Sequence, residues 1–343
     1  MAEETRSDKK RIIVTGGAGF LGSFVCERLL NDGHQVICVD SLVTSQLLNI
    51  QQMLKNPDFE FIKKDVSEGM DIEEMPELEK FDLKFKGVDE IYHFACPMSV
   101  KNFEQNRITT LRANSLGMYN ALEMAVKHKA KFFLASTSVI YGDRPEDNHP
   151  LKEEEYGLLN HLEPRSCYDE GRRWAETMAY TYEQVHGLDV RVARIFRTYG
   201  PRMPLEDGQM LPDFVMNAID GKDLVIYGDE GFRSSFIYVT DVVDGIVRLM
   251  GQSKDPGTVN LGSDYDLKIS KVAERIIELT GSGSAIAYME PLPFMRELGL
   301  PNLTRAKDSL GWIPLVSLDQ GLKKLVEYTV ANKNLLKAGF GGK

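Results

Sequence analysis

Three side chains in this sequence, Thr137, Tyr168 and Arg172, have the chemistry needed to take a proton from an alcohol. Tyr168 and Arg172 are four residues apart, so on a helix they would share one face. A cation held beside a phenol favours the phenolate, which makes Tyr168 a candidate base. Thr137 follows a predicted strand and could share the hydrogen bond to the same hydroxyl. We predict that these residues are catalytic and oxidise an alcohol, a reaction that needs a hydride acceptor.

A glycine-rich turn near the N-terminus predicts that acceptor. The segment TGGAGFLG at 15–22 follows an apolar run and precedes a helical pattern, with one more residue between its first two glycines than the ordinary dinucleotide fingerprint. Gly16 permits the tight turn, Gly19 lets the backbone approach a pyrophosphate, and Gly22 allows close packing of helix and strand. Asp40 ends the next apolar run, where a carboxylate binds ribose hydroxyls and repels a 2′-phosphate. The turn therefore predicts NAD rather than NADP.

A parallel sheet with helices on both faces would position these residues. Apolar runs alternate with helical patterns, which is typical of an α/β fold with a Rossmann-type doubly wound parallel sheet. The predicted strands are 11–15, 36–39, 59–62, 90–94, 131–135 and 190–195, with a long helix over 106–128. Beyond residue 200 we predict a strand at 224–227 and helices at 211–220, 238–250, 269–280, 304–310 and 318–332.

The C-terminal half is predicted to interleave with this sheet rather than to follow it. An NAD-binding region would comprise 11–200 and receive about 236–265. A smaller interleaved C-terminal substrate-binding region would comprise 201–235 and 266–332. Residues 1–10 and 333–343 are predicted to be flexible tails.

Composition argues against several classes of protein. With 41 basic and 51 acidic residues the net charge is −10, which argues against a nucleic-acid polymer or an anionic membrane as partner. No apolar run reaches the roughly 18 residues of a membrane helix, and the charged opening decapeptide is unlike a signal peptide. The four cysteines and six histidines lack metal-ligand spacing, so we expect no metal site and a reducing, cytoplasmic setting.

Several segments resemble one known family. The match is carried by TGGAGFLG at 15–22, STS at 136–138, YG at 141–142, the Tyr-x-x-x-basic segment at 168–172 and RIFRTYGPRM at 194–203. These resemble the extended short-chain dehydrogenases/reductases of the NAD-dependent nucleotide-sugar epimerase/dehydratase family. Within that family the chain is most similar to UDP-glucuronate decarboxylases, through HFACPMS at 93–99, RSCYDEGRRWAET at 165–177, NLGS at 260–263 and KDSLGWIP at 307–314. The resemblance extends from residue 11 to about residue 330.

The resemblance implies a role for each matching position. The residues expected to bind NAD are Gly16, Gly19, Phe20, Leu21, Gly22, Asp40, Asp65, Val66, Ala95, Asn114, Tyr168 and Arg172. Those expected to bind a nucleotide sugar, which the resemblance implies is UDP-linked, are Pro97, Ser138, Arg197, Arg202, Tyr227 and Arg233. The family reaction oxidises C4 of the sugar to a ketone. Family members also pair the 106–128 helix with the Tyr168 helix across a homodimer interface.

Three departures from the decarboxylase pattern fall close to the predicted catalytic residues. The family lysine after the tyrosine is Arg172, which keeps the charge but not the shape of an ammonium. The glutamate two residues before Tyr141 is Val139, which cannot carry a proton. The asparagine of the Arg-x-Phe-Asn motif is Arg197, which could compensate at the diphosphate for an arginine lost elsewhere.

Two further departures involve arginines of the family. Ser234 replaces one, with Arg233 one residue earlier, and Gly299 replaces another, with Arg296 three residues away. Three interpretations stay open: decarboxylation of UDP-glucuronate; 4-epimerisation of a UDP-hexose or UDP-hexuronate, which Val139 favours; and an NAD-binding protein with an altered substrate or little turnover. The survival of Thr137 and Tyr168 favours an enzyme.

Overall fold

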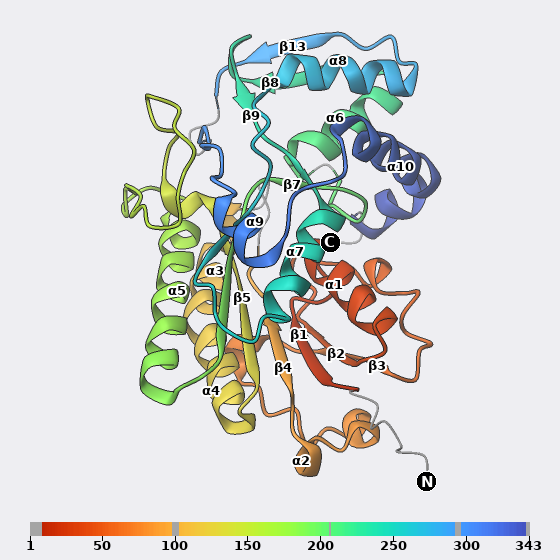
Figure 1. Ribbon diagram of the computed structural model, residues 1–343. Coiled ribbons are helices and arrows are strands. Elements are labelled where there is room, and N and C mark those ends of the chain that lie inside the picture. Colours follow the sequence, from red (N-terminus) through yellow and green to blue (C-terminus); the bar gives the residue numbers. More distant parts are fainter. Residues whose placement is uncertain (1–8, 98–102, 206, 292–295, 341–343) are drawn as a thin grey trace.

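A seven-stranded parallel sheet forms the centre of the protein, whose computed structural model describes residues 9–97, 103–205, 207–291 and 296–340 (Figure 1). Its strand order is β11-β6-β5-β4-β1-β2-β3. The strands are β1 Arg11–Thr15, β2 Gln35–Asp40, β3 Phe59–Lys63, β4 Glu90–His93, β5 Lys131–Thr137, β6 Val190–Ile195 and β11 Val259–Leu261. The order reverses between β1 and β4, and ligands of such sheets bind at that point, beyond the carboxyl ends of the strands.

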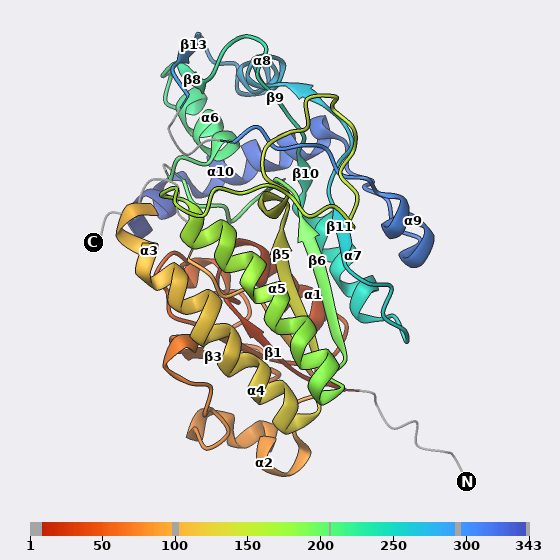
Figure 2. The same ribbon diagram turned by 90° about the vertical axis from the view of Figure 1, so that its left-hand side faces the viewer.

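Helices cover both faces of the sheet because its strands are apolar on both sides. Ile12 and Val14 of β1 belong to the core shared with α1 (Phe20–Asn31) and α7 (Val239–Met250). Ile13 belongs to the core shared with α4 (Met118–His128) and α5 (Ser166–His186). Figure 2 shows α3 (Phe103–Arg112), α4 and α5 in front of the sheet. The alternation along each strand thus anchors a helical layer on either side.

A second region lies beyond the carboxyl ends of the strands, at the top of Figure 1. Its helices α6 (Met210–Ile219), α8 (Ile269–Thr280) and α10 (Leu318–Phe340) pack on one another, and β8 (Leu224–Tyr227) pairs in parallel with β13 (Ile286–Met289). Between α6 and α8 the chain returns to the main sheet through α7 and β11. The second region is therefore built from segments on both sides of that return.

Short elements complete the described chain. They are α2 Leu83–Lys86, α9 Thr304–Leu310, the pair β7 Thr198–Tyr199 with β10 Ile237–Tyr238, the pair β9 Arg233–Ser234 with β12 Leu267–Lys268, and short 3₁₀ helices at Leu47–Asn49, Val66–Glu68, Pro76–Phe81 and Ser138–Tyr141. The two-residue strands were not predicted, because two residues carry no detectable periodicity.

Two helices differ from their predicted extents. The helix expected over 106–128 begins at Phe103 and contains a π-type turn at Ala113–Gly117, where it passes close to the loop after β3. A Cβ at Gly117 would lie 2.8 Å from the Val66 side chain, so the approach needs glycine. The last helix, expected to end at 332, continues to Phe340 because no glycine or proline lies between Leu322 and Ala338.

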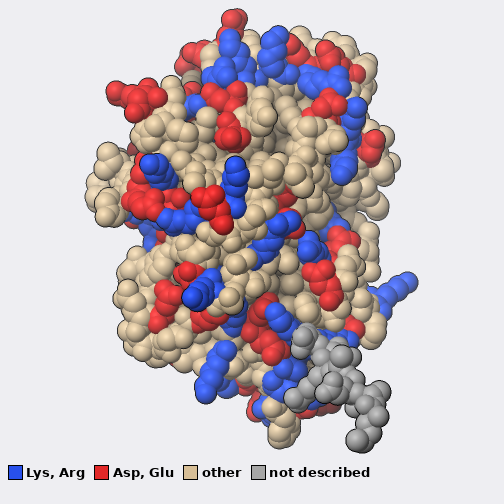
Figure 3. All heavy atoms as spheres, in the orientation of Figure 1, with Lys and Arg blue, Asp and Glu red and all other residues tan. Residues whose placement is uncertain are grey.

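The outer surface carries both signs of charge. Figure 3 shows acidic and basic side chains interspersed over the face that it presents, which is typical of a solvated surface. No helix within the described ranges has the length and apolarity that crossing a bilayer requires.

Candidate active site

A cavity of about 870 Å³ opens at the carboxyl ends of the central strands and extends under the second region. It is the place where an open α/β sheet binds its ligand. The predicted site residues that line it are Gly16, Gly19, Phe20, Leu21, Gly22, Asp40, Asp65, Val66, Ala95, Pro97, Thr137, Ser138, Tyr168, Arg172, Arg197 and Tyr227. Residues from both halves of the chain thus meet in one space.

The glycine turn has the close contacts that its sequence predicts. Gly16 has a φ of +70°, and a Cβ there would lie 2.8 Å from the backbone nitrogen of Ala95. A Cβ at Gly22 would lie 2.2 Å from the Gly16 carbonyl oxygen. Helix α1 begins directly after Gly19 without a side-chain cap. Its first N–H groups are therefore available to a pyrophosphate.

Asp40 is held rigidly at the end of β2. Its carboxylate accepts hydrogen bonds from the Ala18 N–H at 3.0 Å, the Leu42 N–H at 2.8 Å and the Ser45 hydroxyl at 2.6 Å. A carboxylate has roughly four lone-pair positions, so one remains for a ribose hydroxyl. Asp65, after β3, uses one oxygen to accept the Ser67 N–H at 2.8 Å. Both acids line the cavity.

Arg172 provides a test of whether a dinucleotide fits. The side chain is buried, lines the cavity, and has Nε and Nη1 without a hydrogen-bond partner among the described residues. Burial lowers the pKa of Arg172, but contacts with Cys96 and with the Tyr168 hydroxyl outweigh burial, and the net shift is upward. Buried unpaired donors are costly. The ribose hydroxyls of NAD would satisfy them, so the residues present fit this cofactor.

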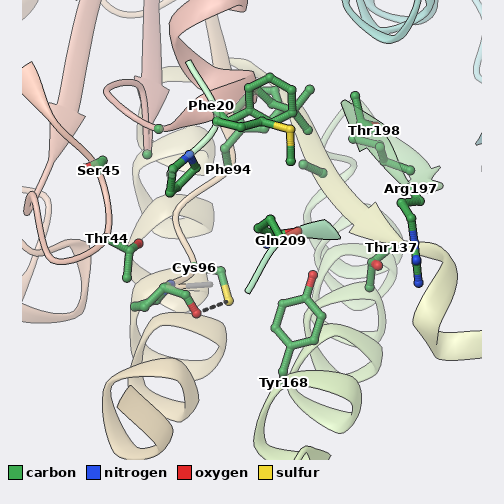
Figure 4. A pocket seen from close by; sticks show the side chains of 18 of the residues that line it. Phe20, Thr44, Ser45, Phe94, Cys96, Thr137, Tyr168, Arg197, Thr198 and Gln209 are labelled. Atoms are coloured by element: carbon green, nitrogen blue, oxygen red, sulfur yellow. Dashed lines mark hydrogen bonds between the residues drawn. The ribbon is translucent and has the colours of Figure 1, made fainter. Parts of the chain in front are cut away.

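Thr137 and Tyr168 face the same space from different elements. Thr137 ends β5, and its hydroxyl accepts the Val139 N–H at 3.4 Å. Tyr168 lies in the first turn of α5, and the Arg172 guanidinium carbon is 5.7 Å from its ring centroid. Figure 4 shows both hydroxyls pointing into the cavity, with the Arg197 side chain beside Thr137. The geometry is that of a base and a hydroxyl that hold one substrate alcohol.

Val139 makes this part of the cavity apolar. It is 4% exposed and packs with Tyr168, and the partly buried side chains of Cys96, Cys167 and Leu298 pack against the pair. A proton-carrying group is therefore replaced by a hydrophobic contact next to the candidate base.

A buried ion pair supports the strand that carries Thr137. Glu176 of α5 accepts hydrogen bonds from the Ser136 hydroxyl and from Nε and Nη2 of Arg194 on β6. Nη1 of Arg194 in turn bonds the Tyr141 hydroxyl at 2.9 Å. Ser136 precedes Thr137 on β5, and Glu176 is on the same helix as Tyr168. The network therefore ties the elements that carry the Thr137–Tyr168 pair to one another.

Three predicted site residues are not brought to the cavity wall. Arg202 turns to Glu27 at 2.6 Å and lies 4.2 Å from the Phe24 ring centroid. Arg233 binds Asp266 at 2.6 Å, and Asn114 donates to the Thr110 carbonyl inside its own helix and to the Cys96 sulfur. Each of these side chains therefore bonds to another residue of the protein and does not face the cavity.

The five departures from the decarboxylase pattern fall into two groups, those that line the cavity and those that do not. Arg172, Val139 and Arg197 line the cavity, whereas Ser234 and Gly299 do not. A Cβ at Gly299 would lie 2.7 Å from the Leu151 side chain, so Leu151 occupies the space that a larger side chain would need.

Two cavity-lining arginines, Arg165 and Arg296, were not predicted as site residues. Arg165 could have been found, because it precedes Tyr168 by three residues and so shares its helix face. Arg296 reaches the cavity through tertiary structure alone. Among the residues with described placement, no group of three or more His, Cys, Asp or Glu side chains could hold a metal ion.

The chain is similar to several known proteins. The sequence model of the NAD dependent epimerase/dehydratase family matches residues 12–262. UDP-glucuronic acid decarboxylase 1 of Xenopus tropicalis is 41% identical over 324 residues, which cover 94% of this chain and 73% of that protein.

Solved structures of nucleotide-sugar enzymes are also similar to this chain. The UDP-glucose 4-epimerase of Thermotoga maritima with UDP-glucose has a TM-score of 0.82 at 28% identity, covering 95% of this chain and 99% of that one. The dTDP-glucose 4,6-dehydratase of Bacillus anthracis in complex with NAD has a TM-score of 0.81 at 26% identity, covering 96% and 99%.

Proposed function

The chain belongs to the NAD dependent epimerase/dehydratase family, and from this premise we propose that it oxidises C4 of a UDP-linked sugar in the cavity described above. The observation that carries the proposal is the meeting of the glycine turn with Thr137, Tyr168 and Arg172 in one space. The decarboxylase similarity over most of the chain supports a UDP-linked substrate.

The side chains have distinct tasks in this proposal. The glycine turn and Asp40 would hold the pyrophosphate and a ribose of NAD, while Arg172 would bind the other ribose. NAD supplies a hydride acceptor that later serves as the donor. Tyr168 takes the proton of the C4 hydroxyl, Thr137 holds that hydroxyl by a hydrogen bond, and the Arg172 charge favours the phenolate. The sugar leaves this step as a 4-ketone.

The first candidate for the complete reaction is decarboxylation of UDP-glucuronate. A uronic acid oxidised at C4 is a β-keto acid, which loses carbon dioxide and leaves an enolate at C5. Protonation of that carbon and return of the hydride to C4 give a UDP-pentose. The similarity to UDP-glucuronic acid decarboxylases along the chain favours this reaction.

The second candidate is 4-epimerisation, and Val139 favours it. Return of the hydride to the opposite face of the ketone requires Thr137 and Tyr168 but no acid at position 139. Because Val139 and Leu298 present hydrocarbon there, C5 lacks a nearby side-chain acid from that position. The epimerase reaction keeps every carbon of the sugar.

One experiment separates these reactions. The purified protein, supplied with NAD, is given UDP-glucuronate or UDP-galactose, and the sugar is followed by proton NMR. We expect turnover of UDP-glucuronate. Release of carbon dioxide with a UDP-pentose identifies decarboxylation, and inversion at C4 without loss of mass identifies epimerisation. Bound NAD without turnover of any UDP-sugar would contradict the proposal and leave the reading of a binding protein.

We further propose a homodimer formed through α3, α4 and α5. These helices lie together on one side of the sheet (Figure 2), and they and the turn between α3 and α4 carry large exposed apolar side chains. These are Ile108, Leu111, Leu116, Tyr119 and Trp174, which are 45–69% exposed. Burial of such a face is what stable dimers require.

Light scattering after size exclusion tests the dimer. We expect the mass of two chains for the natural protein and of one chain for Leu116→Glu, because a charge would be buried in the interface. Phe85→Glu, at a residue of α2 that is 88% exposed, is the matched control and should leave the mass unchanged. A monomeric natural protein would overturn the proposal.

A reducing, cytoplasmic setting is also proposed. All four cysteines are free thiols, and Cys26 and Cys38 are fully buried beneath Gly17. Burial raises the pKa of Cys38 well above its usual range, so this thiol stays protonated. Free thiols are typical of compartments that do not form disulfides.

A further inference from the structure

Three guanidinium groups converge on the cavity beside the candidate base. Arg165 precedes α5, Arg197 follows β6, and Arg296 comes from the segment after β13. The guanidinium carbon of Arg165 lies 5.5 Å from the centroid of the Tyr168 ring. Figure 4 shows Arg197 beside Thr137. Positive charge is thus concentrated near the residues that would act on C4.

Two of these arginines are neutralised by acidic side chains. Arg165 donates to Asp169 at 2.9 Å. Arg296 forms ion pairs with Asp143 at 3.2 Å, with Glu163 at 2.5 Å and with Asp169 at 3.4 Å. These carboxylates hold both guanidiniums in place and offset much of their charge.

Arg197 has no such partner. Its side chain forms no hydrogen bond or ion pair with any residue that the structure describes, and the guanidinium carbon lies 5.9 Å from the centroid of the Phe236 ring. Burial, and then the charge of Arg165, lower the pKa of Arg197 to about 10, so the group stays charged at neutral pH. Arg197 is partly buried in the cavity wall. A cation in such a place without an anion is costly, and an anionic group of a ligand would lower that cost.

The position of Arg197 indicates which anion this is. In a pyranose ring the diphosphate is attached at C1, across the ring from C4, whereas C6 is attached at C5, next to C4. Thr137 and Tyr168 would hold C4, and Arg197 lies beside Thr137. A charge there is closer to a C6 carboxylate than to the diphosphate. Val139, in place of an acid, removes a negative charge that would repel such a carboxylate.

We propose that Arg197 binds the C6 carboxylate of the sugar and thereby selects a nucleotide-linked uronic acid over a neutral nucleotide sugar. This specificity role rests on the proposed function, because the C4 chemistry orients the ring. It replaces the expectation that Arg197 compensates at the diphosphate.

Calorimetric titration of the NAD-loaded protein tests the proposal without requiring turnover. UDP-glucuronate and UDP-glucose differ only at C6, so their affinities isolate the carboxylate. We expect the natural protein to bind UDP-glucuronate at least tenfold more tightly. Arg197→Asn, which removes the charge, should weaken UDP-glucuronate about ten- to hundredfold, the effect of losing a hydrogen bond between charged groups. The affinity for UDP-glucose should change less than about threefold.

Matched variants make the result decisive. Arg197→Lys keeps the charge and should retain most of the preference, and Arg248→Asn, on an exposed part of α7 outside the cavity, should change neither affinity. An equal loss for both nucleotides after Arg197→Asn would assign the residue to the diphosphate and overturn the proposal. A natural protein without preference would also overturn it, whether or not a variant folds.

Measurements of binding test the role of Arg197, and measurements of turnover test the proposed C4 chemistry, so the two can fail separately. Preference for UDP-glucuronate without any turnover contradicts the proposed function and leaves the role of Arg197 intact. Turnover without that preference contradicts the role of Arg197 and leaves the C4 chemistry intact.

Discussion

Replacement of Tyr168 by phenylalanine is expected to lower turnover of the UDP-sugar by about 10²- to 10⁴-fold, the usual contribution of a positioned proton-transfer group. The variant loses only the hydroxyl that faces Thr137 and the cavity. The ring should stay packed with Val139, because the substitution keeps the aromatic ring. NAD should therefore remain bound. Turnover is measured with saturating UDP-glucuronate, and bound NAD is quantified after denaturation.

The same substitution elsewhere on α5 serves as control. Tyr182 donates to Glu123 on the outer part of the helix and does not line the cavity. Tyr182→Phe should keep turnover within about twofold of the natural protein, because surface changes of this kind have small effects. Equal turnover in the Tyr168→Phe variant would remove Tyr168 from the mechanism. Loss of NAD together with turnover would instead show that the hydroxyl is needed to bind the cofactor.

Replacement of Glu176 by alanine is expected to reduce the free energy of unfolding by about 3–5 kcal/mol, the effect of removing one partner from a buried ion pair. Glu176 is 6% exposed, and its carboxylate is the acceptor for Ser136 and Arg194. Burial lowers the pKa of Arg194, but Glu176 reverses this shift and the net change is upward. Without Glu176, Arg194 would be a buried cation lacking its main partner. Equilibrium denaturation in urea measures the change.

An exposed pair on the same helix provides the comparison. Glu170 is 3.6 Å from Arg173, and both side chains are 37% exposed. Glu170→Ala should change the free energy of unfolding by less than about 1 kcal/mol, because solvent screens such pairs. A similar, small loss for both variants would contradict the structural role assigned to the Glu176 network. A large loss for Glu176 alone should also reduce turnover, since β5 carries Thr137.

Much of the fold was predictable because its signals are local. The apolar run, the glycine turn and the following helix specify one βαβ unit within a few residues. The strand expected at 90–94 ends at His93, and the one at 131–135 extends to Thr137, so only the element ends moved. Even the face shared by Tyr168 and Arg172 follows from helical spacing, and the 5.7 Å between the guanidinium carbon and the ring centroid agrees with it.

The pairing of the arginines with acidic side chains could not be predicted from local sequence. Arg197, Arg202 and Arg233 were expected to have similar roles, yet Arg202 pairs with Glu27 and Arg233 with Asp266. Glu27 and Asp266 are distant in the sequence from the arginines they bind. Which acid reaches which arginine depends on how α1 and the loop before β12 pack. Local spacing carries no information about that choice.

The sequence by itself determined the strand–turn–helix pattern, the preference for NAD at Asp40, and the chemistry available from Thr137, Tyr168 and Arg172. These follow from backbone periodicity, from the freedom of glycine and from side-chain type. Only the tertiary structure decided that Arg197 lacks an acidic partner among the described residues and that Arg296 reaches the cavity. The physical reason is that electrostatic pairing and burial are set by distances in space, which segments far apart in the chain establish together.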